Sequence, residues 1–196
     1  MREYDLIADW YASDRLDTTD GGGVPEVMTL ASSIQVGGRV LDIGCGNGVP
    51  LTKGLLISGH RVVGLDSASS MLRRFRANCP HAPSVKGIVQ ACPFAADTFD
   101  AAIAWGVMFH LKQAEQVQAI ASVSRVLKSG APFLFTAGDA DDDSGDHVGT
   151  MNGVEFHYYS LAIDGYRRVL NDHGFTLVDV RHDSGRNLYY LAQKAV

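Results

Sequence analysis

The sequence feature that most constrains the fold is a turn with three glycines in five residues. It lies within VLDIGCGNGVP (residues 40–50), where an apolar run containing Asp42 leads into Gly44, Gly46 and Gly48. Glycine weakens strands and helices, but it adopts positive φ and lets another group lie against its main chain. We therefore expect a strand to end at this turn and a ligand to bind against the turn's backbone.

Short apolar runs typical of strands alternate with segments of helical spacing along most of the chain. The alternation favours a doubly wound α/β sheet with helices on both faces, and the last two strands are close enough to pair antiparallel. Helices are predicted over residues 4–15, 27–34, 52–58, 69–77, 115–127 and 163–173, and strands over residues 39–43, 61–66, 85–89, 100–106, 132–138, 154–160, 175–180 and 187–193.

A length of 196 residues predicts a single domain over residues 1–196. We expect residues 1–36 to form an N-terminal helical lid. The polar, glycine-rich segment DADDDSGDHVGTMNG (residues 139–153) is unusually long for a loop, so residues 139–160 are interpreted as an insertion on the substrate side. Its acidic cluster lacks the order of a calcium loop, and no metal site is predicted.

Charge and composition argue against several partners. The net charge of −5 disfavours nucleic acid and anionic membranes. The amino terminus lacks the apolar core of a signal peptide, and the longest apolar stretch, residues 101–109, is too short to span a membrane. Three cysteines without metal-type spacing indicate reduced thiols and a cytoplasmic protein. The oligomeric state is not readable from these features.

A second acid, Asp66, ends the next predicted strand. In a doubly wound sheet the ligand lies at the carboxyl ends of the strands, and an acid there accepts hydrogen bonds from ribose hydroxyls. The glycine turn and Asp66 together predict a nucleoside-containing cofactor. A dinucleotide turn has the pattern G-x-G-x-x-G, whereas Val49 occupies the sixth position here. This departure weakens the nicotinamide alternative.

Four motifs in the expected order resemble the class I S-adenosylmethionine-dependent methyltransferases, in particular the small-molecule enzymes of the methyltransferase type 11 kind. They are VLDIGCGNG, VVGLDSASSMLRR, ACPFAADTFDAAIAWGVMFHL and RVLKSGAPFLFT, which together span about a hundred residues. The resemblance implies a Rossmann-like, mostly parallel seven-stranded sheet whose last strand is antiparallel. It also implies S-adenosylmethionine as cofactor and S-adenosylhomocysteine as product.

The resemblance assigns cofactor-binding roles to positions that match the family's motifs. The turn would lie against the methionine part, Asp66 would hold the ribose, and Ser67 and Met71 would flank the adenine. Ile88 stands where the family often has an acid that binds the adenine amino group. The cofactor-binding residues predicted are Asp42, Gly44, Cys45, Gly46, Asp66, Ser67, Met71, Val89, Gln90 and Trp105, with Tyr11 in an aromatic lid.

The expected reaction is methyl transfer to an oxygen or nitrogen atom of a small molecule by in-line displacement. Alignment of the nucleophile supplies most of the rate enhancement, and a general base adds about a hundredfold or more. His110, which follows the strand over residues 100–106, is the predicted base, although a structural role fits it equally well. A strand over residues 154–160 would place His157 and Tyr158 on opposite faces, with at least one of its tyrosines in the core. Two alternatives are an inactive cofactor-binding module and a nicotinamide-dependent oxidoreductase.

Overall fold

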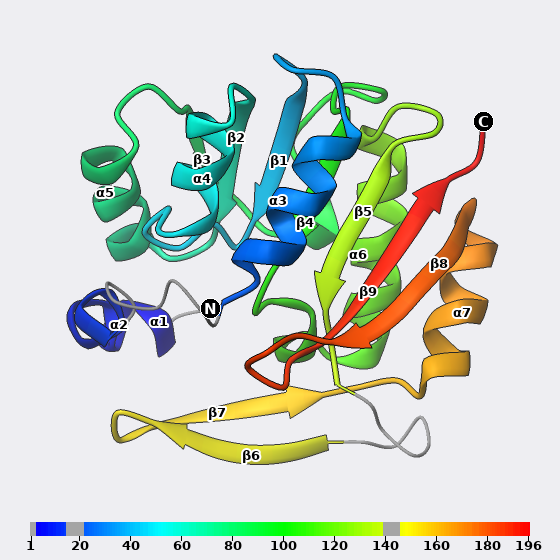
Figure 1. The fold of residues 1–196 in the computed structure, drawn as a ribbon. Coiled ribbons are helices and arrows are strands. Elements are labelled where there is room, and N and C mark those ends of the chain that lie inside the picture. Colours follow the sequence, from blue (N-terminus) through cyan, green and yellow to red (C-terminus); the bar gives the residue numbers. More distant parts are fainter. Residues whose placement is uncertain (1–2, 15–21, 139–145) are drawn as a thin grey trace.

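The computed structural model describes residues 3–14, 22–138 and 146–196, and a seven-stranded sheet forms its centre. Strands β1 to β5 run parallel, whereas β9 pairs antiparallel with both β5 and β8. The Rossmann-like sheet with an antiparallel last strand is therefore confirmed (Figure 1). The sheet has the order β3-β2-β1-β4-β5-β9-β8 and consists of β1 (Arg39–Ile43), β2 (Arg61–Asp66), β3 (Ser84–Lys86), β4 (Ala101–Ala104), β5 (Pro132–Thr136), β8 (Phe175–His182) and β9 (Leu188–Lys194).

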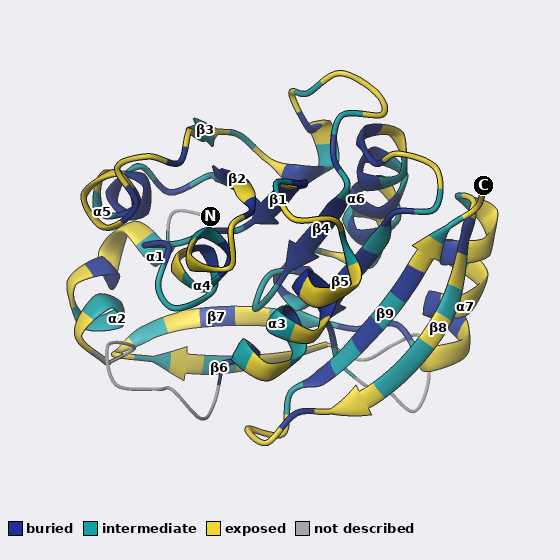
Figure 2. Cartoon of the chain, turned by 45° about the horizontal axis from the view of Figure 1, so that its top comes forward, coloured by how far each residue is buried: buried dark blue, intermediate teal, exposed yellow. Residues whose placement is uncertain are grey.

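Helices cover both faces of this sheet. Helices α3 (Val24–Ser33), α4 (Leu51–Ile57) and α5 (Ser69–Asn78) lie on the near face in Figure 1, and α6 (Gln113–Val126) and α7 (Ile163–Asp172) lie behind. The central strands are consequently buried on both faces, which Figure 2 shows as dark blue ribbon through β1 and β4. This double burial explains why β4 reads as an uninterrupted apolar run.

The N-terminal segment differs from the prediction of one helix over residues 4–15. It forms two short helices, α1 (Glu3–Leu6) and α2 (Ala8–Asp14), separated by a bend at Ile7. Ile7 is 1% exposed, and the Asp5 side chain binds the Ser70 backbone at the start of α5. The bend lets this segment bury Ile7 while contacting α5, a tertiary constraint that helical periodicity does not contain.

The predicted loop over residues 139–153 is also partly wrong. Strand β6 (Asp146–Met151) pairs antiparallel with β7 (Val154–Tyr159) in a separate two-stranded sheet. Asn152 and Gly153 connect the two strands, both with positive φ, which is the turn chemistry of a tight hairpin. Residues 139–145, which hold most of the acidic cluster, lie outside the described residues.

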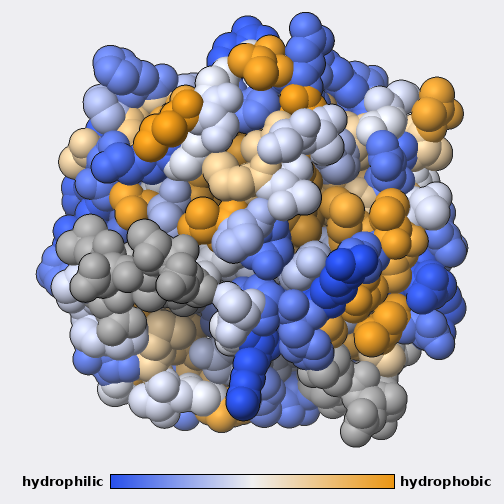
Figure 3. All heavy atoms as spheres, viewed as in Figure 1, coloured by the Kyte–Doolittle hydropathy of each residue, from blue (hydrophilic) through white to orange (hydrophobic). Residues whose placement is uncertain are grey.

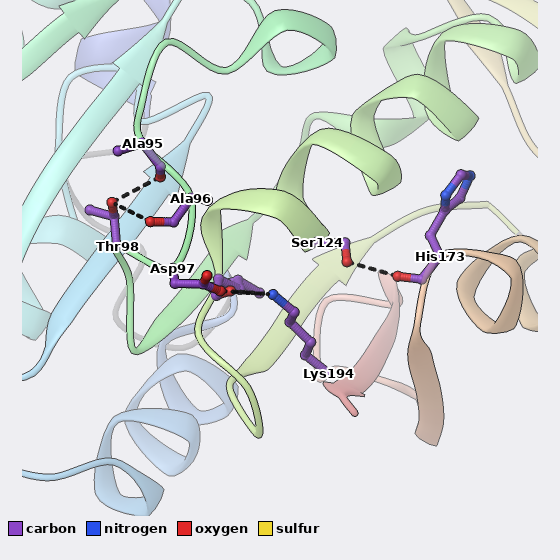
Figure 4. A network of polar contacts seen from close by, with 8 residues as sticks. Ala95, Ala96, Asp97, Thr98, Ser124, His173 and Lys194 are labelled. Atoms are coloured by element: carbon purple, nitrogen blue, oxygen red, sulfur yellow. Dashed lines mark hydrogen bonds and ion pairs between the residues drawn. The ribbon is translucent and has the colours of Figure 1, made fainter. Parts of the chain in front are cut away.

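The edge of the sheet at the amino ends of the parallel strands is closed by ordinary polar contacts. In Figure 4 the Thr98 hydroxyl donates hydrogen bonds to the Ala95 and Ala96 carbonyls, and Lys194 Nζ donates to the Asp97 carboxylate over 3.2 Å. Nearby, Lys128 donates to Asp100 at 2.6 Å. These contacts provide partners for polar groups in the loop before β4 and at the end of β9.

Two 3-10 turns complete the described chain, η1 (Val89–Ala91) before β4 and η2 (Met108–His110) after it. The strand predicted over residues 85–89 is shorter than expected, because β3 ends at Lys86 and Val89 already belongs to η1. Across the described residues, the helices are too short or too polar to cross a membrane.

Candidate functional site

The glycine turn connects β1 to α4, and its three glycines fall into two groups according to what a side chain there would contact. All three have positive φ, between 53° and 81°. A Cβ on Gly44 would lie 2.1 Å from the Val107 side chain, and one on Gly48 would lie 2.8 Å from the Cys79 sulfur. A Cβ on Gly46 would meet only the Gly44 carbonyl, at 4.0 Å. Two glycines therefore make room for packing, and Gly46 leaves open space toward a ligand.

Asp42 lies beneath this turn and is 4% exposed. Its carboxylate accepts a 2.5 Å hydrogen bond from the Thr52 hydroxyl on α4. Burial raises the pKa of Asp42 to about 7, against the lowering effect of the Thr52 bond. A buried carboxylate with so little compensation is costly for the protein alone and well placed to receive a positively charged group.

Asp66 ends β2 beside the turn, as predicted. Its two oxygens accept backbone N–H bonds from Gly46 at 2.9 Å and from Ala68 at 2.8 Å. Burial raises the pKa of Asp66, although both amide bonds oppose that shift. These bonds, together with one from the Ser67 backbone, hold the carboxylate in place. A carboxylate has about four lone-pair positions, so it can accept a further donor.

A cavity of about 360 Å³ opens at the carboxyl ends of the central parallel strands, where these elements meet. It brings together residues that lie more than a hundred positions apart in the sequence. Ten of the residues predicted from the sequence line it: Tyr11, Gly44, Gly46, Asp66, Ser67, Met71, Val89, Gln90, Trp105 and His110.

Asp42 and Cys45 do not line this cavity. They border an adjoining hollow of about 50 Å³, which also touches Tyr11, Gly46 and Trp105. The Cys45 sulfur points into the contact between β2 and α5, where Gly64 leaves space for it. Burial raises the pKa of the Cys45 thiol, so this cysteine is an uncharged packing group whose backbone alone belongs to the turn.

One end of the cavity is formed by the segment between β3 and η1. Gly87, Ile88, Val89 and Gln90 all line it, although Ile88 is 51% exposed overall. The apolar Ile88 side chain has no group to accept an amine hydrogen bond. Trp105 also lines the cavity, packs against Gly23, and has its ring centroid 6.1 Å from that of Tyr189.

His110 on η2 forms part of the cavity wall and is 9% exposed. Its Nδ1 lies 3.3 Å from the His157 carbonyl oxygen, and its Nε2 lies 3.0 Å from the Tyr4 hydroxyl. Burial lowers the pKa of His110 to about 4, so the ring is uncharged at neutral pH.

Aromatic rings from three elements surround His110. Tyr4 of α1 packs against Phe156 of β7 at 5.1 Å, and Tyr158 of β7 lies 4.9 Å from the imidazole. Phe156 and Tyr158 share one face of β7, whereas His157 points outward and is exposed. The prediction of a core tyrosine on this strand is wrong, because Phe156 is the buried ring and both tyrosines are partly exposed.

Several cavity residues were not predicted from the sequence. Ile43, Leu65 and Val107 are apolar residues at strand ends, and no local signal distinguishes them from core. Glu115 also lines the cavity, but its carboxylate accepts the Lys112 backbone N–H at the start of α6. The spacing of Lys112 and Glu115 identifies this capping role and not the cavity.

A larger groove of about 870 Å³ lies at the opposite edge, between α3 and strands β5 and β9. Figure 3 shows hydrophobic side chains gathered over this side of the molecule, near β8 and β9. Four of its charged groups pair with one another, Asp100 with Lys128 and Asp179 with Arg181. Burial shifts the pKa values of Asp66 and His110 in the smaller cavity and of Asp42 in the hollow that adjoins it.

No group of three or more histidine, cysteine or acidic side chains within residues 3–14, 22–138 and 146–196 is arranged to hold a metal ion.

Comparisons with known proteins agree on the type of domain. The family model described as a methyltransferase domain matches residues 40–130. An uncharacterized methyltransferase of Synechocystis sp. is 38% identical over 125 residues, covering 62% of this chain and 58% of the relative. Botryococcene C-methyltransferase of Botryococcus braunii is 31% identical over 174 residues, covering 77% of this chain and 45% of the relative. The chain thus spans about half the length of these two relatives.

Solved structures share the whole fold. The CcbJ methyltransferase from Streptomyces caelestis aligns over 100% of this chain and 99% of its own, with a TM-score of 0.80 and 17% identity. The [4+2]-cyclase SpnF aligns over 100% and 95%, with a TM-score of 0.79 and 18% identity. A 1,6-didemethyltoxoflavin-N1-methyltransferase from Burkholderia thailandensis aligns over 99% and 87%, with a TM-score of 0.75 and 19% identity.

Proposed function

The chain belongs to the class I S-adenosylmethionine-dependent methyltransferases, and we propose that it methylates an oxygen or nitrogen atom of a small molecule. One observation supports this most strongly. The glycine turn and Asp66 face the same 360 Å³ cavity as His110, an uncharged and hydrogen-bonded histidine. A nucleoside-binding acid and a base candidate in one cavity fit a group-transfer site.

The residues present fit the cofactor well. When bound, S-adenosylmethionine supplies a methyl group activated by a positively charged sulfur. We assign Asp66 to the ribose hydroxyls, since backbone amides hold its carboxylate in place beside the glycine turn. Ser67, Met71, Val89 and Gln90 would enclose the adenine. With Ile88 in place of an acid, the adenine amino group would depend on Gln90 or on backbone carbonyls.

At the other end, the buried Asp42 and the backbone of Gly44, Cys45 and Gly46 would hold the methionine part. An ammonium group near Asp42 would compensate a carboxylate whose pKa burial raises to about 7. Tyr11 and Trp105 border both hollows and would cover the junction between them.

Residues 1–36 and 139–160 would form the cover of this single domain. Tyr4 and Tyr11 of the N-terminal segment line the cavity, and Asp5 holds α1 to the start of α5. Strand β7 closes the same side through Phe156. A small-molecule acceptor fits this enclosed arrangement, and the names of two similar proteins support it, since botryococcene and 1,6-didemethyltoxoflavin are small molecules.

The net charge of −5 and three free, buried cysteines support a cytoplasmic enzyme without a nucleic-acid partner. Two other functions compete with methyl transfer. A cofactor-binding module without turnover would use the same cavity, and SpnF, a [4+2]-cyclase, demonstrates that this fold carries other reactions. Family membership disfavours the nicotinamide-dependent alternative.

Calorimetric titration with S-adenosylmethionine, S-adenosylhomocysteine and NADH tests cofactor choice first. We expect binding of the first two and none of NADH. Release of S-adenosylhomocysteine in the presence of a small-molecule library then tests turnover. Cofactor binding without turnover on any acceptor favours the binding module, and NADH binding alone would overturn the proposal.

A further inference from the structure

We propose that the Glu115 carboxylate binds the amino group of the cofactor's adenine and replaces the acid that the family often has at the position of Ile88. This inference rests on the proposed function and deepens it, because it names the side chain that recognises the base. An adenine amino group has two N–H donors, so one donor is left for Glu115 when Gln90 or a backbone carbonyl accepts the other.

The cavity contains two carboxylates that come from different elements. Among the described residues that line it, Asp66 and Glu115 are the acidic ones. Backbone amides hold Asp66 at the end of β2 beside the glycine turn, which suits it to the ribose. Glu115 belongs to the first turn of α6. The second carboxylate is therefore available for another part of the ligand.

Hydrogen bonds along α6 show which segment Glu115 faces. Ser122 Oγ accepts the Cys92 backbone N–H at 3.0 Å, and Arg125 donates to the Phe94 carbonyl at 2.6 Å. Helix α6 thus runs in the same direction as the segment that follows η1, and it packs against η1 itself. Glu115 precedes Ser122 by seven residues, which is about two turns, or about 10 Å, along the same helix face. Glu115 is therefore on the face of α6 that is turned toward the start of η1.

The start of η1 is the end of the cavity assigned to the adenine, and its walls are largely apolar. Ile88, Val89 and Leu111 line the cavity there with hydrocarbon side chains. Such side chains suit the faces of a purine, but an amino group enclosed among them without a hydrogen-bond acceptor would be costly. A carboxylate is the strongest acceptor available to a protein for such a group, because hydrogen bonds to charged groups are about twice as strong as neutral ones.

Glu115 can take this role together with its structural one. Its Oε2 accepts the Lys112 backbone N–H at 2.9 Å, and a carboxylate has about four lone-pair positions. The helix dipole also stabilises a negative charge in the first turn. Glutamine serves in this type of cap as well as glutamate does. Glu115→Gln therefore keeps the cap, and its amide NH₂ group places a donor where the other carboxylate oxygen was.

The test compares two ligands on each protein by calorimetric titration. The ligands are S-adenosylhomocysteine and its analogue with hydrogen in place of the adenine amino group. We expect the wild type to bind S-adenosylhomocysteine about tenfold or more tightly than the analogue, because the analogue lacks a hydrogen bond to a charged group. In Glu115→Gln we expect this preference to fall to about threefold or less, with the analogue bound as in the wild type.

Glu26→Gln is the matched control. Glu26 is also an acid in the first turn of a helix, α3, but it lines the larger groove. We expect this variant to keep the wild-type preference between the two ligands. Thermal unfolding checks that both variants are folded.

Nuclear Overhauser effects in the wild-type complex with S-adenosylhomocysteine provide a readout that needs no variant. We expect contacts between the adenine amino protons and the Glu115 methylene protons. An undiminished preference in folded Glu115→Gln, or amino protons close to Gln90 but not to Glu115, would overturn the inference and leave the cofactor assignment intact. A wild type that does not bind S-adenosylhomocysteine would overturn the proposed function as well.

Discussion

The carboxylates at the two ends of the parallel strands have opposite pKa shifts. At the carboxyl ends of the strands, burial raises the pKa values of Asp42 and Asp66, and the described residues place no lysine or arginine in an ion pair with either. At the amino ends, partial burial of Asp100 is outweighed by the Lys128 ammonium and the Arg39 backbone N–H, which lower its pKa. At the amino ends, protein groups thus compensate the charge of Asp100. At the carboxyl ends, Asp42 and Asp66 are buried carboxylates whose charge is left for a ligand to compensate. This difference in pKa shifts points to the smaller cavity. Cavity size alone would instead favour the larger groove at the amino ends of the strands.

The largest expected effect concerns Asp42. Its folded pKa of about 7 is above the ordinary value of 3.8, so the folded protein loses stability as pH rises between these values. Asp42→Asn keeps an oxygen for Thr52 and removes the charge. We expect the variant to be more stable than wild type by up to about 4 kcal/mol at pH 8, and by less than about 1 kcal/mol at pH 4. Urea unfolding at both pH values measures this, and Asp97→Asn at the amino edge is the control. A difference that does not depend on pH would contradict the buried-charge interpretation.

The glycines permit a second comparison between the edges. Gly44 and Gly130 both have positive φ, 66° and 72°, so alanine costs about 1–2 kcal/mol at either position. Only Gly44→Ala also collides with Val107, whereas a Cβ on Gly130 meets nothing within 4 Å. We expect Gly44→Ala to lose about 1–3 kcal/mol more unfolding free energy than Gly130→Ala. Equal losses would mean that Val107 moves aside without cost.

Asp66→Ala and Asp100→Ala compare a ligand-binding acid with a paired one. We expect Asp66→Ala to weaken S-adenosylmethionine binding tenfold or more, because an unpaired ribose costs about 1–3 kcal/mol. Asp100→Ala leaves the cavity untouched and should bind as the wild type does. Calorimetric titration measures both, after thermal unfolding confirms that each variant is folded. If Asp66→Ala binds S-adenosylmethionine as tightly as the wild type does, the assignment of Asp66 to the ribose hydroxyls is wrong.

The smallest effect is expected at the exposed ion pair of Asp97 and Lys194. The Asp97 side chain is 67% exposed, so water and salt screen this pair. Asp97→Asn keeps a residue that tolerates the positive φ of 50° at this position. We expect a loss below about 1 kcal/mol in low salt that disappears in 1 M sodium chloride. A larger, salt-independent loss would mean that the amino edge also contains strongly coupled charges.

Local chemistry in the sequence was sufficient for most of the fold and for much of the site. Alternating apolar runs identified the parallel strands, since doubly buried strands must be apolar throughout. Glycines and acids at strand ends indicated the cavity, because parallel strands bring their carboxyl ends to one edge. The hairpin of β6 and β7 was missed although Asn152-Gly153 is a strong turn signal. The polar composition of that segment outweighed the signal.

The sequence by itself determined the sheet, the glycine turn with Asp66, and the type of cofactor that such a turn suits. Only the tertiary structure decided which glycines serve packing, because Val107 and Cys79 are distant in sequence from the turn. It also decided the partners of His110, which come from α1 and β7, and the pKa values that burial shifts. Contacts between residues more than thirty positions apart leave no periodic trace in a sequence, and the chemistry proposed here depends on those contacts.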